Sequence, residues 1–267
     1  TVLAIAGFGF KLSVVPFQMW TPDVYEGSPT PVAAFLSVAS KAAAFGVVLR
    51  LFYSGFESVS TDWALLFAVL SAVTMTVGNL IAMSQVTMKR LLGYSAIAHA
   101  GYMLVGLAAV AVWSQEPTGS DLGPSALLFY LVAYAVTNLS AFFAVIAISN
   151  RTGSDLIEDF AGMGKRSPWI AGILTLALIS LMGIPPTAGF IGKLFLFQSA
   201  INSGLMWLAV IGVINSVISA YYYLRIVRTM YLKPAISMEP VVQNISSHVA
   251  LGVAGACVLL IGLFPDP

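Results

Sequence analysis

Residues 181–198 read LMGIPPTAGFIGKLFLFQ, in the middle of an apolar run that extends over residues 168–201. A helix of that length would measure roughly 50 Å, whereas the hydrocarbon core of a bilayer is about 30 Å thick. Pro185 and Pro186 each remove a backbone N–H donor, Gly183 precedes them and a second glycine follows. The sequence therefore predicts a membrane helix that is broken between these two glycines.

The composition excludes a water-soluble globule. Of the 267 residues 59% are hydrophobic and only 9% are charged, against about 25% charged in an ordinary soluble domain. The net charge of +1 gives no reason to expect nucleic acid as a partner. Cys257 is the single cysteine, too few for an iron–sulfur cluster or a cysteine zinc site. We therefore expect no cofactor in this chain, no metal site and no catalytic residues of a redox reaction.

Long apolar runs divide the rest of the chain. Because backbone polar groups inside lipid must be hydrogen-bonded within the chain, each run is predicted to be a transmembrane helix. The predicted fold is an all-α, polytopic transmembrane helix bundle with short loops, one of which is the segment TPDVYEGSPTP at residues 21–31. The eight predicted spans are residues 1–20, 31–53, 63–84, 89–113, 125–149, 168–201, 205–228 and 249–264.

The cations at the helix ends fall on one side of this topology, and only Arg50 lies near the other. The positive-inside rule makes that side cytoplasmic, so the loop with Asp23 lies in the cytoplasm and the C-terminus outside, with a bacterial inner (cytoplasmic) membrane as the default location. Tyr221, Tyr222 and Tyr223 are predicted to form an interfacial aromatic anchor there. The eight cations are Lys89, Arg90, Arg151, Lys165, Arg166, Arg225, Arg228 and Lys233.

Three lysines, Lys11, Lys41 and Lys193, lie inside the predicted spans. Lys41 is expected roughly 16 Å into its helix, close to the midplane. Because a lysine there costs about 2.5–3.5 kcal/mol, such residues usually face a hydrated or polar interior. No Asp or Glu is expected at matching depth, so their counter-charges must be water, polar side chains or acids outside this sequence. The three lysines are our candidates for a proton pathway.

His99 is also expected at mid-depth, in the sequence SAIAHAGYM. An imidazole there could relay protons between the lysines, and a hydrogen-bonded packing histidine fits the sequence equally well. The lysines have a structural alternative too: one reaches an interface, and another pairs with an upstream acid without moving protons.

Two parts of the chain resemble each other. Residues 7–18 (GFGFKLSVVPFQ) and 189–198 (GFIGKLFLFQ) share Gly-Phe-x-x-Lys-Leu followed by Phe-Gln. Pro16 is expected to break the first helix as Pro185 and Pro186 break the other. Equivalent lysines on two broken helices an odd number of spans apart indicate an inverted repeat of the kind found in antiporters. The predicted units are residues 1–53, the end of the first repeat; 54–233, the second repeat; and 234–267, a C-terminal transmembrane helix.

Four stretches together make the chain resemble a known family. The motif VPFxxWTPDVYEGxPTPV, within residues 10–51, is long and specific, and the others are residues 88–106, 180–197 and 220–225. They resemble subunit N of respiratory complex I, the proton-pumping NADH:quinone oxidoreductase. The resemblance covers almost the full chain, from the seventh to the fourteenth helix of that subunit.

The resemblance implies roles for the lysines. Lys11 matches the lysine of the broken seventh helix and would be the switch. Lys41 matches the lysine of the eighth helix and would pass protons laterally. Lys193 matches the lysine of the broken twelfth helix and would be the terminal group. Gln18 departs from the family, in which many members have a titratable histidine. The glutamate that pairs with the seventh-helix lysine in the family would lie upstream of Thr1, and a chain without an initiator Met is expected to be a piece of a longer one.

The resemblance also implies partners. The chain would be a non-redox subunit of a translocase, with NAD, FMN, iron–sulfur clusters and quinone in partner subunits. Its own partners would be other membrane-arm subunits, including antiporter-like sisters, besides lipid, water and protons. Two alternatives stay open: a subunit of a multi-subunit sodium/proton antiporter, against which the WTPDVYEG segment weighs, and a passive scaffold with structural lysines.

Overall fold

The computed structural model describes residues 2–54, 60–113, 122–235 and 245–265. Within these ranges the chain forms helices and no β-strand, apart from one isolated bridge between Thr87 and Leu156. The predicted all-α fold is therefore confirmed. The helices are α1 (Val2–Leu12), α2 (Trp20–Gly27), α3 (Thr30–Phe35), the π-helix η1 (Leu36–Ser40), α4 (Lys41–Ser54), α5 (Ser60–Ala82), α6 (Met88–Trp113), α7 (Leu122–Thr152), the 3-10 helix η3 (Ile157–Phe160), α8 (Met163–Arg166), α9 (Pro168–Met182), α10 (Ala188–Asn202), α11 (Met206–Leu232) and α12 (Ile245–Leu263).

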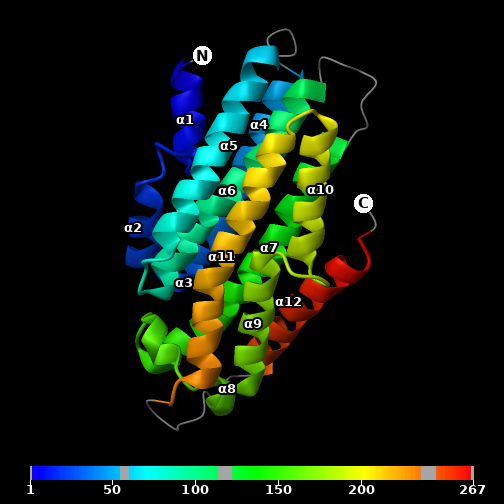
Figure 1. The fold of residues 1–267 in the computed structure, drawn as a ribbon. Helices are drawn as coiled ribbons and strands as arrows, with labels where there is room; N and C mark the ends of the chain where they lie inside the picture. The colour runs from blue at the N-terminus through cyan, green and yellow to red at the C-terminus, as the bar shows by residue number, and fades with distance from the viewer. Residues whose placement is uncertain (1, 55–59, 114–121, 236–244, 266–267) are drawn as a thin grey trace.

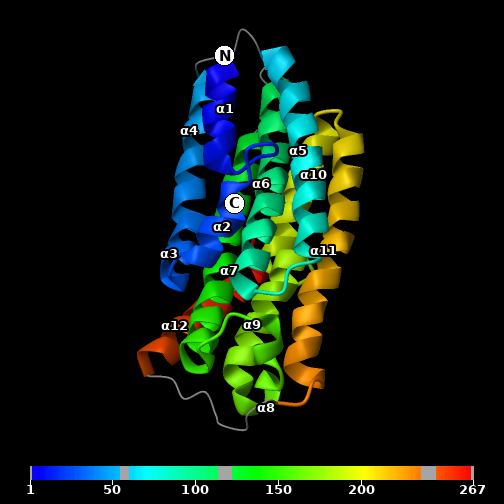
Figure 2. The same ribbon diagram turned by 90° about the vertical axis from the view of Figure 1, so that its left-hand side faces the viewer.

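The helices form one elongated bundle around α6 (Figure 1). From Leu91 to Val110 every side chain of α6 except that of Tyr94 is buried, as expected for a helix with neighbours on all sides. Figure 2 shows α1 beside α4 on one side of the bundle and α5 beside α11 on the other. Helix α12 crosses α7, α9 and α10 obliquely. The core of the molecule therefore lies along α6.

Six helices of the described residues are long and apolar enough to cross a membrane, against the eight spans that the sequence predicts. They are Thr30–Leu51, Trp63–Ala82, Met88–Val110, Gly123–Thr152, Met206–Leu232 and Ile245–Leu263. Of the other two predicted spans, residues 168–201 contain the two shorter helices α9 and α10, and residues 1–20 contain α1 and the first residue of α2. The α9 and α10 helices have 15 residues each, about 23 Å, so neither alone crosses a 30 Å core.

Both predicted breaks coincide with interruptions of the helices. Helix α9 ends at Met182 and α10 begins at Ala188, so Gly183, Pro185 and Pro186 lie between them. Helix α1 ends at Leu12, and the turn that contains Pro16 leads into α2. A further irregularity, which the sequence did not suggest, is the π-helical turn η1 directly before Lys41. Such turns are rare and occur frequently at functional sites.

One predicted loop is wrong in its local structure. The segment at residues 21–31 was expected to be a turn-rich loop, but residues 20–27 form the helix α2. Pro22 lies in the first turn, where a missing N–H donor breaks no helical hydrogen bond, and Asp23 there interacts favourably with the helix dipole. Proline and aspartate, which favour turns elsewhere, here begin a helix that follows α1 after the turn with Pro16.

Candidate functional site

Lys193 is buried on α10, with 4% of its surface exposed, and its ammonium group points at the end of α9. The nitrogen Nζ donates to the carbonyl oxygens of Leu181 at 3.0 Å and Met182 at 2.9 Å. The last carbonyls of a helix have no partner inside it and carry partial negative charge. The break between α9 and α10 therefore supplies the acceptors that hold this cation.

Gly183 makes this arrangement possible. Its φ of 86° is left-handed, and its N–H donates to the carbonyls of Ile179 and Ser180, which ends α9 in the manner of a Schellman motif. A Cβ atom at Gly183 would lie 2.9 Å from Cδ of Lys193. The glycine therefore both turns the chain out of the helix and leaves room for the lysine stem.

A tyrosine and a serine complete the surroundings of Lys193. The nitrogen Nζ donates to Oγ of Ser216 on α11 at 3.2 Å and lies 4.4 Å from the centroid of the Tyr102 ring on α6. The hydroxyl of Tyr102 lies 3.1 Å from the same Ser216 oxygen. A cation over an aromatic face is attracted by the ring. Lys193 is therefore bound by helix carbonyls, a hydroxyl and a ring, with no carboxylate within 4.0 Å among the described residues.

His99 lies one turn before Tyr102 on α6 and is buried among tyrosines. Its Nδ1 atom is 2.6 Å from the hydroxyl of Tyr130 on α7, and its Nε2 atom is 3.4 Å from the hydroxyl of Tyr223 on α11. Tyr223 also shares a hydrogen bond with Ser95, one turn earlier on α6. Both ring nitrogens of His99 therefore face hydroxyl groups that can donate or accept, as a relay residue requires.

Lys41 approaches the same helix from the other side. It is 3% exposed, and its Nζ atom donates to the carbonyl oxygen of Ala96 on α6 at 2.5 Å. Ser37, one turn earlier in η1, accepts a hydrogen bond from Nδ2 of Asn138 on α7 at 2.7 Å. Because Ala96 lies one turn from His99, Lys41 and Lys193 meet α6 on either side of that histidine. The structure thus places Lys41, His99 and Lys193 along one buried polar line.

Lys11 does not belong to this line in the part of the chain that the structure describes. Its side chain is exposed and lines an open cavity of about 730 Å³ bounded by α1, α3, η1 and α4. The other walls are mostly apolar, with Phe8, Phe35 and Val47 among them. No described residue forms an ion pair with Lys11. The ion pairs of Lys89 with Asp155, of Arg90 with Asp23 and Glu26, and of Lys233 with Glu158 lie elsewhere, at the end of the bundle where α6 begins.

The predicted aromatic anchor is wrong for two of its three residues. Tyr221 is 59% exposed, but Tyr222 and Tyr223 are completely buried. Tyr222 donates to Oδ1 of Asn79 on α5 at 2.9 Å, and Asn79 in turn donates to Asn215 on α11 at 3.1 Å. Three consecutive residues of a helix point in different directions, so they cannot all face one interface. The middle of α11 faces a polar interior instead.

Sequence reasoning also missed the tyrosines and the serine that contact His99 and Lys193. Tyr130 and Tyr134 lie one turn apart on α7. On α6, Ser95, His99 and Tyr102 follow one another at intervals of about one turn. Polar residues spaced by three or four positions share a helix face. That spacing was a signal available in the sequence. His248 is exposed on α12, and the described residues contain no group of three His, Cys, Asp or Glu that could hold a metal ion.

A protein-family model matches most of the chain. The model described as "NADH:quinone oxidoreductase/Mrp antiporter, TM" matches residues 1–219. The chain belongs to this family. The resemblance expected from the sequence motifs is thereby confirmed, and a membrane protein with several transmembrane helices is supported by both the family and the apolar helices.

Curated members of the NADH:quinone oxidoreductase/Mrp antiporter family match over the whole chain. NADH-quinone oxidoreductase subunit N of Dehalococcoides mccartyi is 48% identical and covers 99% of this chain, and the protein of that name from Moorella thermoacetica is 44% identical and covers 100%. In both cases the match covers 54% of the relative. The chain thus spans about half the length of the curated relatives it matches.

Solved structures of the family share the fold. A chain of respiratory complex I from Thermus thermophilus with bound aureothin superimposes with a TM-score of 0.81 at 35% identity, over 99% of this chain and 56% of that one. A chain of the Mrp complex from Dietzia sp. gives a TM-score of 0.86 at 21% identity, over 98% of this chain and 55% of that one. At 21% identity the match to the Mrp complex shows only a common fold. The fold therefore does not distinguish subunits of NADH:quinone oxidoreductase from subunits of Mrp antiporters.

Proposed function

We propose that this chain is part of a proton-translocating membrane subunit of a respiratory NADH:quinone oxidoreductase. The observation that carries the proposal is the buried polar line from Lys41 past His99 to Lys193. Burying two amines and an imidazole inside an apolar bundle is costly, and such residues usually mark an ion pathway. Protons would move along this line, with ordered water joining groups that do not touch directly, while quinone is reduced in other subunits.

The two buried lysines would hold protons without any carboxylate of the described residues. A proton on Lys193 is stabilised by the carbonyl end of α9 and by Ser216. A proton on Lys41 is stabilised by a single carbonyl of α6. Because uncharged acceptors bind an ammonium group less tightly than a carboxylate does, small movements of these acceptors would change how firmly each proton is held. His99 would pass the proton between the two lysines.

Lys11 would be the switch of this pathway, although it faces an open cavity here. Its role depends on an acid from another part of the full-length subunit: pairing with that acid would hold a proton on Lys11, and weakened pairing would release it toward Lys41. Gly183, Pro185 and Pro186 would keep the second break open for water. Pro16 would do the same for the first break.

The membrane topology proposed with this function has eight crossings. The pairs α1–α2 and α9–α10 would each cross the membrane as one broken span, in addition to the six long helices. Residues 1–53 and 54–233 would belong to two inverted repeats, and 234–267 would add the last helix. The end of the bundle with Asp23 would face the cytoplasm of a bacterium, and the C-terminus would lie outside.

The partners follow from the family. The subunit would itself carry out no redox chemistry and would bind other membrane-arm subunits, among them antiporter-like sisters. NAD, FMN, iron–sulfur clusters and quinone would belong to those partners. The relatives with 44–48% identity carry the name NADH-quinone oxidoreductase subunit N, whereas the Mrp structure shares only 21% identity. These values support the quinone-linked complex over a sodium/proton antiporter.

The proposal is tested by Lys41→Met and Lys193→Met in the full-length subunit of the assembled complex. We expect both variants to assemble and to lose proton pumping into proteoliposomes, because methionine fills a similar volume without a titratable group. Lys165→Met, on the exposed surface of α8, is the control and should pump normally. Normal pumping in both buried variants would contradict the proposal, and failure to assemble in both would favour the passive scaffold.

A further inference from the structure

Three buried polar atoms without a protein partner lie along α7 and under α2. Tyr134 and Asn138 are one turn apart on α7, and Phe142, one turn further, packs edge-on against the ring of Tyr25, with centroids 6.4 Å apart. Within the described residues no protein atom forms a hydrogen bond with the hydroxyls of Tyr25 and Tyr134 or with Oδ1 of Asn138. All three residues are at least 97% buried. Buried polar atoms rarely lack partners, so these atoms are suited to bind water.

The antiparallel packing of α6 on α7 places these three atoms beside the residues of α6 that contact Lys41 and Tyr134. Tyr25 lies against Gly93, where a Cβ atom would be 3.5 Å from its Cδ2. One turn further, α6 presents the carbonyl that binds Lys41. Another turn brings His99, whose ring centroid lies 5.0 Å from that of Tyr134. The rise from Gly93 to His99 is about 9 Å, so the unpartnered atoms lie on the short path from Tyr25 to Lys41 and His99.

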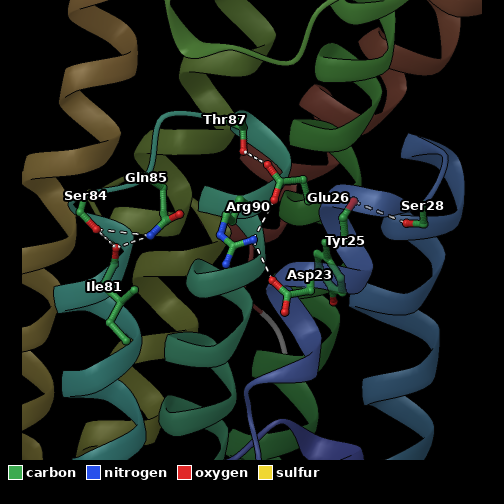
Figure 3. A network of polar contacts seen from close by, with 9 residues as sticks. All are labelled: Asp23, Tyr25, Glu26, Ser28, Ile81, Ser84, Gln85, Thr87 and Arg90. Atoms are coloured by element: carbon green, nitrogen blue, oxygen red, sulfur yellow. Dashed lines mark hydrogen bonds and ion pairs between the residues drawn. The ribbon is translucent and has the colours of Figure 1, made fainter.

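At its other end the path reaches a charged cluster, which Figure 3 shows. Nη1 of Arg90, one turn before Gly93 on α6, lies 2.7 Å from both Oδ1 of Asp23 and Oε2 of Glu26. The side chains of Asp23 and Glu26 are 68% and 41% exposed. Both acids belong to α2, as Tyr25 does. The buried hydroxyl of Tyr25 therefore belongs to the same short helix as the two carboxylates at this end of the bundle.

We propose that Tyr25, Asn138 and Tyr134 line a water-binding access branch, through which protons pass between the Asp23 end of the bundle and the centre formed by Lys41 and His99. The proposal rests on the proton-conducting function proposed above. The Tyr25 hydroxyl donates its proton to a water on the inner side and accepts one from a water on the outer side. No charge remains on the ring oxygen, and one proton has moved inward.

The test is Tyr25→Phe in the full-length subunit of the assembled complex, with proton pumping measured in proteoliposomes. Phenylalanine keeps the ring against Gly93 and Phe142 and removes only the hydroxyl. We expect the pumping rate to fall by about tenfold, the factor that corresponds to one lost hydrogen bond of ordinary strength. Tyr221→Phe removes a hydroxyl from an exposed tyrosine and should pump at the normal rate.

Lys193→Met in the same preparation separates this proposal from the broader one. If Lys193→Met abolishes pumping and Tyr25→Phe pumps normally, the access branch is wrong and the proton-conducting function stands. If neither variant affects pumping, both proposals fail. A high-resolution map of the complex gives an independent answer when Tyr25→Phe does not assemble: water within hydrogen-bonding distance of Tyr25, Asn138 and Tyr134 supports the branch, and dry packing overturns it.

Discussion

The ammonium nitrogen of Lys193 lies 2.9 Å from the carbonyl oxygen of Met182, the last residue of the helix that precedes it in the chain. The lysine and the break are therefore one structural unit. The break exposes carbonyls that a continuous helix would use internally, and the lysine satisfies them from the following helix, α10. A proton on Lys193 thus joins α9 to α10, and its loss would weaken that connection.

Gly183→Ala should damage this unit. The left-handed backbone at φ 86° costs an L-residue about 1–2 kcal/mol, and the added Cβ would meet the stem of Lys193 at 2.9 Å. We expect a lower unfolding temperature of the purified complex and slower proton pumping. Gly172→Ala, inside α9 with no atom within 4 Å of the added Cβ, should leave both measurements unchanged or raise the stability slightly. Equal behaviour of the two variants would show that the turn geometry does not matter.

Tyr223→Phe should slow proton transfer more than it affects stability. The change removes the hydroxyl that contacts both His99 and Ser95, at a cost of about 1 kcal/mol for the hydrogen bond. Tyr222→Phe removes an equally buried hydroxyl that donates to Asn79. We therefore expect similar losses of stability in the two variants and reduced pumping only in Tyr223→Phe. Pumping that falls equally in both would mean that the loss does not act through the contact of Tyr223 with His99.

Helix breaks and buried lysines could be predicted because their signals are local. Two adjacent prolines in an overlong apolar run leave little choice but a break near Gly183. A lysine in the middle of an apolar span must find a polar surrounding, which Lys41 and Lys193 do. The partners could not be predicted in the same way. Carbonyl oxygens such as that of Ala96 carry no mark in the sequence, since every residue has one.

The tyrosines of α11 illustrate a second limit of prediction from the sequence. Tyr222 and Tyr223 precede Arg225 by only a few residues, so proximity to a cation indicated an interface, whereas helix packing buries both rings. Which face of α11 meets α5 and α6 is decided by tertiary packing. The helical α2 was missed for a related reason: Pro22 and Asp23 favour turns and helix starts alike, and only the contacts of α2 with α6 distinguish the two.

Arg90→Gln should weaken the attachment of α2 to α6 by a modest amount. Its two ion pairs of 2.7 Å involve carboxylates that are largely exposed, and such pairs contribute about 0.2–1 kcal/mol each. The unfolding temperature should fall slightly at low salt, and the difference from the unmodified protein should shrink at high salt because ions screen exposed charges. Lys233→Gln, which removes a longer contact of 3.5 Å to Glu158, is the control. A salt-independent difference would point to lost packing instead.

Asn79 and Tyr222 should behave as one unit in a double-mutant cycle. Tyr222 donates to Oδ1 of Asn79, and Asn79 donates to Oδ1 of Asn215. Asn79→Ala leaves both neighbours without their buried partner, at a cost of about 1–3 kcal/mol for each unsatisfied group. Adding Tyr222→Phe should therefore cost less in the Asn79→Ala background than alone, by at least about 0.5 kcal/mol. The measurement is the unfolding temperature of the four proteins, and a cycle with the exposed Tyr221→Phe should be additive. Additivity in both cycles would mean that the hydrogen bond between Tyr222 and Asn79 contributes nothing.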